Sequence, residues 1–134
     1  MKHQHFDVGT VGFYGAYWAC AGGSDCAVIA MIGDDPEDRL ARSAVKWLCG
    51  RGVNVLTMSP AKKDYGHHNY PLERVETAIS WLKVNGNHKI GIAGASTTGT
   101  LALTAAAMFP DVTLTIAMTP SDFVWQGFMQ GKKD

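Results

Sequence analysis

The feature that most constrains the fold is the segment at residues 89–108, KIGIAGASTTGTLALTAAAM. A short apolar run with β-branched residues is followed by a turn rich in glycine and hydroxyl side chains. An alanine-rich stretch with helical spacing comes directly after the turn. This order predicts a buried strand, a sharp turn and a helix, with the hydroxyl of Ser96 at the apex of the turn.

One kind of site with this shape is a nucleophile elbow, in which a strained turn presents a serine to substrate. Such a turn has no room for bulky neighbours, and Gly94 and Ala95 meet that requirement. Thr98 does not, because the G-x-S-x-G pattern has glycine at this position and the glycine comes one residue later, at Gly99. The motif therefore predicts Ser96 as a nucleophile, but it is imperfect.

A second kind of site is a phosphate-binding loop at a helix N-terminus. The run STTGT at residues 96–100 resembles the hydroxyl-rich FMN phosphate loop of flavodoxins. That loop follows the first strand of its fold, whereas here it follows about the fifth, which disfavours FMN. A third interpretation is purely structural, with serine and threonine side chains that only cap the helix.

The rest of the chain alternates predicted strands and helices. Strands are expected at residues 6–8, 11–20, 26–32, 53–58, 90–93 and 112–118, the first two forming an antiparallel hairpin. One helix is expected after Asp35 and Pro36, with Leu40, Ala44, Trp47 and Leu48 on one face, and another from Pro71, with Leu72, Val75, Ile79 and Leu82 in one stripe. The pattern predicts one α/β domain over residues 1–134. It has three α/β/α layers and a mostly parallel sheet of about six strands.

Loops at the carboxyl ends of parallel strands bind ligands in such sheets. Gly33 and Asp34 follow one predicted strand, a polar loop at residues 59–71 follows another, and Ser96 follows a third. The sequence therefore predicts that these segments meet at one edge of the sheet.

Composition excludes several classes of function. Twelve basic and twelve acidic residues cancel, so nothing favours nucleic acid or an anionic membrane. No apolar run is long enough to span a bilayer, and the N-terminus lacks a signal-peptide pattern. Three cysteines without C-x-x-C spacing predict reduced thiols and a cytoplasmic location, and we expect no metal and no cofactor.

Three segments together resemble one family: AVIAMIGDDPEDRLARSAVKWLCGRGVNVL, KKDYGHHNYPLERVETAISWLK and KIGIAGASTTGTLALTAAAMFPDVTLTIAMTPSDF. They are similar to the α/β-hydrolase superfamily, and more narrowly to the catalytic domain shared by acyl-CoA thioesterases and bile acid-CoA:amino acid N-acyltransferases. The resemblance implies a serine nucleophile at Ser96 and acyl transfer to water or an amine through an acyl-enzyme. It also implies an oxyanion hole that uses the Thr97 N–H and the Gly33–Asp34 segment.

The family's acid and histidine are expected beyond the matched segments, so neither is carried over from the resemblance. Asp122 follows the strand after the elbow, where some α/β-hydrolases have their acid, but a turn aspartate is the simpler interpretation. His67 and His68 lie in a loop at the expected active edge and are candidate bases, unless that loop is only a solvated polar segment.

The fold would have about eight strands in full, and six at most are present here. An exposed apolar edge at Val112–Met118 is therefore expected to pair with a second copy of the chain. The first hypothesis is a serine hydrolase of esters or acyl-thioesters, with little or no turnover expected from this chain. The others are a non-catalytic pseudo-hydrolase that serves in assembly, and an FMN- or phosphate-binding module.

Overall fold

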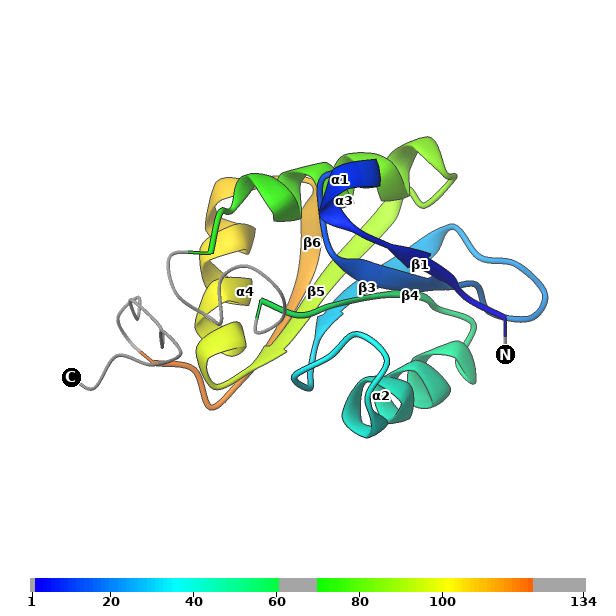
Figure 1. Ribbon diagram of the computed structural model, residues 1–134, viewed down its shortest axis with the longest axis horizontal. Coiled ribbons are helices and arrows are strands. Elements are labelled where there is room, and N and C mark those ends of the chain that lie inside the picture. The colour runs from blue at the N-terminus through cyan, green and yellow to red at the C-terminus, as the bar shows by residue number, and fades with distance from the viewer. Residues whose placement is uncertain (1, 61–69, 122–134) are drawn as a thin grey trace.

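The computed structural model describes residues 2–60 and 70–121. Its six-stranded sheet has the order β1-β2-β4-β3-β5-β6 (Figure 1). The elements in chain order are β1 (Gln4–Phe6), α1 (Val8–Val11), β2 (Gly15–Trp18), β3 (Cys26–Met31), α2 (Arg39–Cys49), β4 (Asn54–Met58), α3 (Glu73–Val84), β5 (Lys89–Ala95), α4 (Thr97–Met108) and β6 (Val112–Met118).

The predicted fold class is confirmed. β4, β3, β5 and β6 run parallel, while β1 and β2 form an antiparallel hairpin whose second strand pairs antiparallel with β4. α3 and α4 cover one face of the sheet and α2 covers the other, which gives three layers (Figure 1). No helix in residues 2–60 and 70–121 has the length and apolar character needed to cross a membrane.

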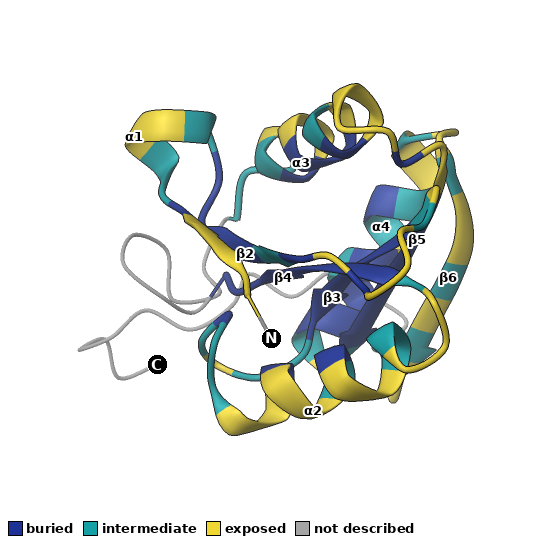
Figure 2. Ribbon diagram, turned by 90° about the vertical axis from the view of Figure 1, so that its right-hand side faces the viewer, coloured by how far each residue is buried: buried dark blue, intermediate teal, exposed yellow. Residues whose placement is uncertain are grey.

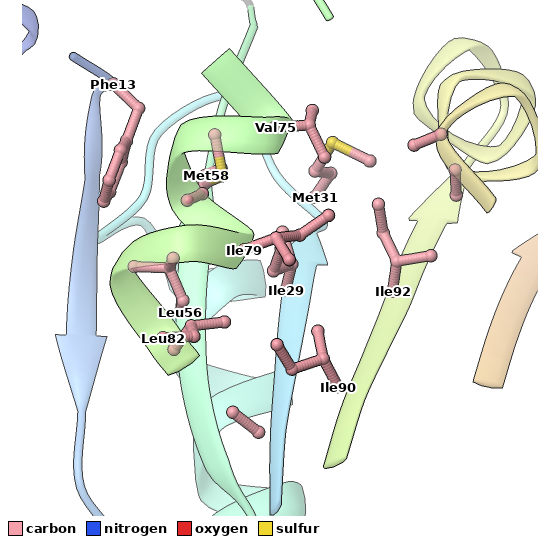
Figure 3. Close-up of a cluster of buried hydrophobic side chains, with 14 of the residues drawn as sticks. Phe13, Ile29, Met31, Leu56, Met58, Val75, Ile79, Leu82, Ile90 and Ile92 are labelled. Atoms are coloured by element: carbon pink, nitrogen blue, oxygen red, sulfur yellow. The ribbon is translucent and has the colours of Figure 1, made fainter. Parts of the chain in front are cut away.

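The larger core lies between the sheet and helices α3 and α4 (Figure 3). Ile29, Leu56 and Ile92 project from neighbouring strands toward Ile79 and Leu82 of α3, and all are at most 3% exposed. Burying one such aliphatic side chain stabilises the fold by about 2 kcal/mol. The stripe predicted for α3 therefore packs on the sheet, although the helix begins at Glu73 rather than at Pro71.

The smaller core lies on the other face, between alternate residues of the same strands and α2. Val28 and Val55 meet Val45 of the helix there. α2 packs on β4 and β3, so the part of this face formed by β5 and β6 stays open (Figure 2). Leu114 and Ile116 of β6 are 57% and 41% exposed on this open part.

The structure corrects the start of α2. Asp35 and Pro36 were expected to begin the helix, but it begins at Arg39 with Asp38 as the N-cap. The Asp35 carboxylate instead accepts the N–H of Glu37 and closes a turn before the helix. Ala41 and Val45 are the residues of α2 that are buried against the sheet.

Only part of the stripe predicted for α2 faces the sheet: Leu48 packs against the smaller core and Ala44 is half-buried. Leu40 and Trp47 are 57% and 56% exposed, although apolar residues at this spacing favour a buried face.

The N-terminal hairpin is shorter than predicted, because the expected strands at residues 6–8 and 11–20 are interrupted by α1. Asp7 caps α1 by accepting the N–H of Thr10 at 3.2 Å, and Gly12 ends it with a left-handed φ of 86°. The pairing of β1 with β2 is nevertheless antiparallel, as expected.

A buried polar network fixes the end of the sheet opposite the strands' carboxyl ends. Asn54 donates to the side-chain oxygen of Asn87 at 2.8 Å and accepts the N–H of Cys20 at 2.9 Å. Asn87 is fully buried and donates to the carbonyl of Leu82. The network joins the starts of β4 and β5 to the loop before β3.

Replacing Asn87 with alanine should lower the free energy of unfolding by about 2 kcal/mol, because buried partners lose their hydrogen bonds. The matched control is Asn85→Ala in the adjacent exposed turn, which removes one solvent-exposed hydrogen bond to the Trp81 carbonyl and should cost less, about 0.5 kcal/mol. Urea denaturation measures both. Equal effects of the two changes would contradict a structural role for the network.

Candidate active site

The turn between β5 and α4 holds Ser96 in a strained conformation. Its backbone has φ 55° and ψ −122°, a region that residues with side chains seldom adopt. The Ser96 N–H donates to the Met118 carbonyl at 2.9 Å, which anchors the turn to the end of β6. The side chain is exposed, as expected for an elbow that presents a hydroxyl.

Two glycines make this turn sterically feasible. A Cβ on Gly94 would lie 2.0 Å from the Thr98 carbonyl oxygen, so the start of α4 could not fold back onto the end of β5. A Cβ on Gly99 would lie 3.0 Å from the Met118 carbonyl oxygen. The small residues around Ser96 are therefore required by close backbone approach on both sides.

Thr98, the departure from the motif, has a defined place in this structure. Its hydroxyl is buried, donates to the Met31 carbonyl at 2.6 Å and accepts the N–H of Ala95 at 2.9 Å. The Thr100 hydroxyl is also buried and accepts the N–H of Ser121 at 2.9 Å. These two hydroxyls thus serve the protein's own backbone, which argues against the flavodoxin-like phosphate loop.

A cavity of about 430 Å³ opens beside Ser96. Its lining includes all four residues that the sequence predicted at the nucleophile and oxyanion positions, Ser96, Thr97, Gly33 and Asp34. The carboxyl ends of β3 and β5 lie side by side here, because Met31 pairs with Gly94 in the parallel ladder. The predicted convergence is therefore observed for the segments at Gly33–Asp34 and at Ser96, while most of the loop predicted at residues 59–71 lies outside the described residues.

The loop after β3 wraps around the carboxylate of Asp38. Asp38 Oδ2 accepts the N–H of Asp34 at 2.8 Å, and Oδ1 accepts the N–H of Ala41 at 2.8 Å. Burial raises the pKa of this carboxyl, but the hydrogen bonds from Ala41, Asp34, Asp35 and Leu40 outweigh it and hold the pKa below the ordinary value of 3.8. The Asp34 N–H is thus engaged in this conformation and does not face a substrate.

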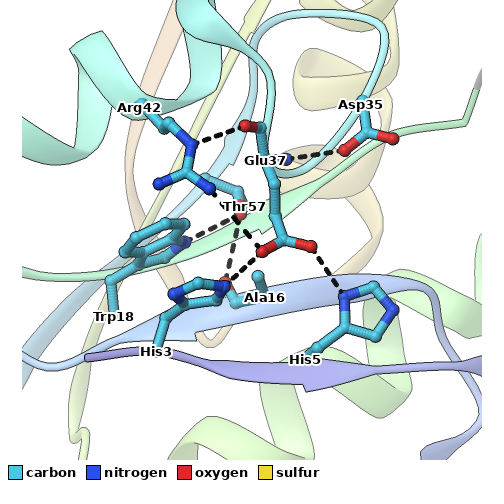
Figure 4. Close-up of polar contacts among 8 residues, drawn as sticks. All are labelled: His3, His5, Ala16, Trp18, Asp35, Glu37, Arg42 and Thr57. Carbon is cyan, nitrogen blue, oxygen red and sulfur yellow. Dashed lines mark hydrogen bonds and ion pairs between the residues drawn. The ribbon is translucent and has the colours of Figure 1, made fainter. Parts of the chain in front are cut away.

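The same loop is tied to the N-terminal strand through Glu37 (Figure 4). The Glu37 carboxylate contacts Nε2 of His3, lies 3.0 Å from Nδ1 of His5, and is 3.9 Å from Nη2 of Arg42. Sequence reasoning assigned no role to these histidines. Their alternate positions on one face of a strand were the only available signal.

Three sequence-predicted residues, His67, His68 and Asp122, lie outside the described residues. Within the described part of the chain, no group of three or more His, Cys, Asp or Glu side chains could hold a metal ion.

No protein-family model and no curated protein matches the sequence. Solved structures do match. The α/β hydrolase GrgF from Penicillium sp. sh18 has a TM-score of 0.70 and 22% identity, over 89% of this chain and 45% of that one. The chain has the α/β-hydrolase fold.

Two further structures give similar matches. A cold-adapted esterase from an Arctic intertidal metagenomic library has a TM-score of 0.68 and 17% identity, over 84% of this chain and 58% of its own. Est1E from Butyrivibrio proteoclasticus, in a structure with bound ferulic acid, has a TM-score of 0.63 and 20% identity. The match covers 87% of this chain and 52% of the Est1E chain. The present chain thus spans about half the length of these α/β hydrolases.

Replacing Thr98 with valine keeps the shape of the side chain but removes the hydroxyl that bonds the Met31 carbonyl and the Ala95 N–H. We expect this change to lower the free energy of unfolding by about 2 kcal/mol. Thr98→Ser is the control, since it keeps the hydroxyl and loses only a methyl group, at a cost of about 0.8 kcal/mol. A valine variant as stable as the serine variant in urea denaturation would refute the bridging role.

Proposed function

We propose that this protein is a serine-dependent hydrolase of esters or acyl-thioesters. The observation that carries the proposal is the strained backbone of Ser96, which holds an exposed hydroxyl over a cavity at the carboxyl edge of the sheet. Within residues 2–60 and 70–121 that hydroxyl makes no hydrogen bond, so the strain is not offset by a structural contact of the side chain. Strain of this kind is concentrated at functional sites.

In the proposed reaction, Ser96 Oγ attacks the acyl carbon of the substrate while a base takes its proton. The bond to the leaving alcohol or thiol then breaks, the leaving group takes up the proton, and an acyl-enzyme remains. Water attacks this intermediate in the same way and releases the acid. We propose His67 or His68 as the base and Asp122 as the residue that orients it.

The oxyanion of the tetrahedral intermediate needs two N–H donors. We assign one to Thr97, the first residue of α4, where the helix dipole also favours negative charge. We assign the other to Gly33, because Asp38 already holds the Asp34 N–H. Gly33 lines the same cavity as Ser96 and Thr97, which supports this assignment.

The substrate class follows from two lines of support. The sequence resembles acyl-CoA thioesterases and related N-acyltransferases, and one of the similar structures is named a cold-adapted esterase. We therefore propose small acyl esters or thioesters as substrates, with no cofactor. A cytoplasmic location stays a prediction from the three cysteines, all of them free thiols.

Changing Ser96 to alanine should abolish covalent labelling by a fluorophosphonate probe, because the probe reacts only with an activated serine hydroxyl. The control is Ser43→Ala, which removes a serine that bonds within α2 to the Arg39 carbonyl. Labelling is read by intact mass, and loss of ester hydrolysis in Ser96→Ala should reach about 1,000-fold or more. Undiminished labelling of the Ser96 variant would rule out this nucleophile.

A second function, self-association, is favoured by the outer edge of β6. This strand is seven residues long, VTLTIAM, with no charge and no proline. On its other side it pairs with β5. An apolar edge strand of this kind is a template for pairing with another chain.

The sequence of β6 is also compatible with antiparallel pairing to a second copy about a two-fold axis at Thr115. Leu114 then lies opposite the partner's Ile116, and both side chains lie on the open face of the sheet, because they pair with Gly91 and Ala93 of β5. Apolar residues thus meet apolar residues. We propose that the chain dimerises in this register.

A lysine at position 116 should prevent this dimer, since charge on an edge strand opposes pairing. The matched control is Val84→Lys, which places the same charge at an 86% exposed site at the end of α3. Sedimentation velocity at micromolar concentration should show a dimer for the parent chain and for Val84→Lys, and a monomer for Ile116→Lys. A monomeric parent chain would disprove the proposal.

A further inference from the structure

We propose that Asp38 is a positioning residue for the reaction, a role that rests on the proposed hydrolase function. Its carboxylate holds the main chain of the loop after β3, so that Gly33 stays fixed across the cavity from Ser96. The residue does not itself touch the reacting atoms. It acts through the loop that it clamps.

The two carboxylate oxygens of Asp38 have separate partners. Oδ1 accepts the N–H of Ala41, which is the ordinary N-cap contact of α2. Oδ2 faces the other way along the chain and accepts the N–H groups of Asp34 at 2.8 Å and Asp35 at 3.2 Å. Only the contact with the Ala41 N–H is needed to cap α2. The contacts with the Asp34 and Asp35 N–H groups therefore need a different explanation.

The backbone of Gly33 lies directly against the Asp38 carboxylate, with no room for a side chain. A Cβ at this position would lie 2.4 Å from one Asp38 oxygen and 2.5 Å from the other. The backbone of Gly33 also has φ 96°, which a residue with a side chain rarely adopts. The loop therefore reaches its shape only with glycine at 33 and the carboxylate of residue 38 against it.

Other contacts hold the same loop from outside. The Ser59 hydroxyl, just after β4, donates to the Asp34 carbonyl at 2.8 Å. His5 of β1 and Arg42 of α2 contact Glu37 at the far end of the loop (Figure 4). A loop fixed on several sides has little freedom to reorganise, which is what electrostatic stabilisation of a transition state requires. Among these contacts, Asp38 is the residue that binds the N–H groups of Asp34 and Asp35.

A serine at position 38 separates the two roles of the residue. Serine caps helices about as well as aspartate, but its short side chain has one oxygen and cannot also reach the Asp34 and Asp35 N–H groups. Asp38→Asn is the second variant, because its amide has one oxygen and can serve either the cap or the loop, but not both. Asp7→Ser is the control, since Asp7 caps α1 through the Thr10 N–H.

The first measurement is amide hydrogen exchange of the 134-residue chain by NMR. In Asp38→Ser we expect the amides of Asp34 and Asp35 to lose protection while the Ala41 amide keeps it. Asp7→Ser should leave all three as they are in the parent chain. Unchanged protection of Asp34 and Asp35 in both Asp38 variants would overturn the clamp.

The second measurement is steady-state hydrolysis of a short p-nitrophenyl ester. A displaced oxyanion loop should lower kcat by about 100-fold, with KM changed less than about threefold, because transition-state contacts are lost and substrate binding is kept. A merely structural cap would leave kcat unchanged. Unchanged or increased kcat in Asp38→Ser would overturn the positioning role, and an increase would show that Asp38 instead withholds the Asp34 N–H from substrate.

The two proposals fail in different ways. A parent chain without any ester turnover refutes the proposed function, and amide exchange then decides on its own whether Asp38 holds the loop. Turnover in the parent chain that is unaffected in Asp38→Ser refutes the inference and leaves the proposed function intact.

Discussion

The hydroxyl of Thr98 joins the two strands on which the candidate site depends. By donating to the Met31 carbonyl and accepting the Ala95 N–H, it locks the start of α4 against the end of β3. This bridge adds a direct side-chain link between the two strands, beside the parallel ladder that pairs Met31 with Gly94. The fold tolerates the strained backbone conformation of Ser96, because hydrogen bonds and close glycine contacts hold the turn on each side.

Side chains also hold the backbone of the loop after β3. Its backbone N–H groups turn inward to the Asp38 carboxylate, and its carbonyl at Asp34 turns to the Ser59 hydroxyl. The elbow and the loop are thus each held by one buried or partly buried side chain that satisfies backbone groups. This arrangement makes the cavity between them a property of the fold, independent of any ligand.

Much of the architecture was predictable, since apolar runs and helical stripes report burial directly. The strand predicted at residues 90–93 and the turn at Ser96 followed from a β-branched apolar run that ends in glycine and hydroxyl residues. The start of α2 did not, because Asp35 followed by Pro36 has the composition of a helix start, whereas Asp38 holds the cap. The reach of Asp38 back to Asp34 depends on the left-handed φ of Gly33, which no local pattern specifies.

Contacts between distant residues were also beyond sequence reasoning. His5 and Glu37 are 32 positions apart and meet only because the hairpin lies beside β4 and the loop before α2. The open face of β5 and β6 likewise depends on where α2 packs, which the misplaced stripe at Leu40 and Trp47 did not reveal.

The most direct test of the central claim is a crystal structure of the chain after reaction with a phosphonate ester. The account predicts a covalent bond from phosphorus to Ser96 Oγ, with the phosphoryl oxygen within hydrogen-bond distance of the Thr97 and Gly33 N–H groups. A phosphonate bound to another residue, or a phosphoryl oxygen directed away from Gly33, would contradict it.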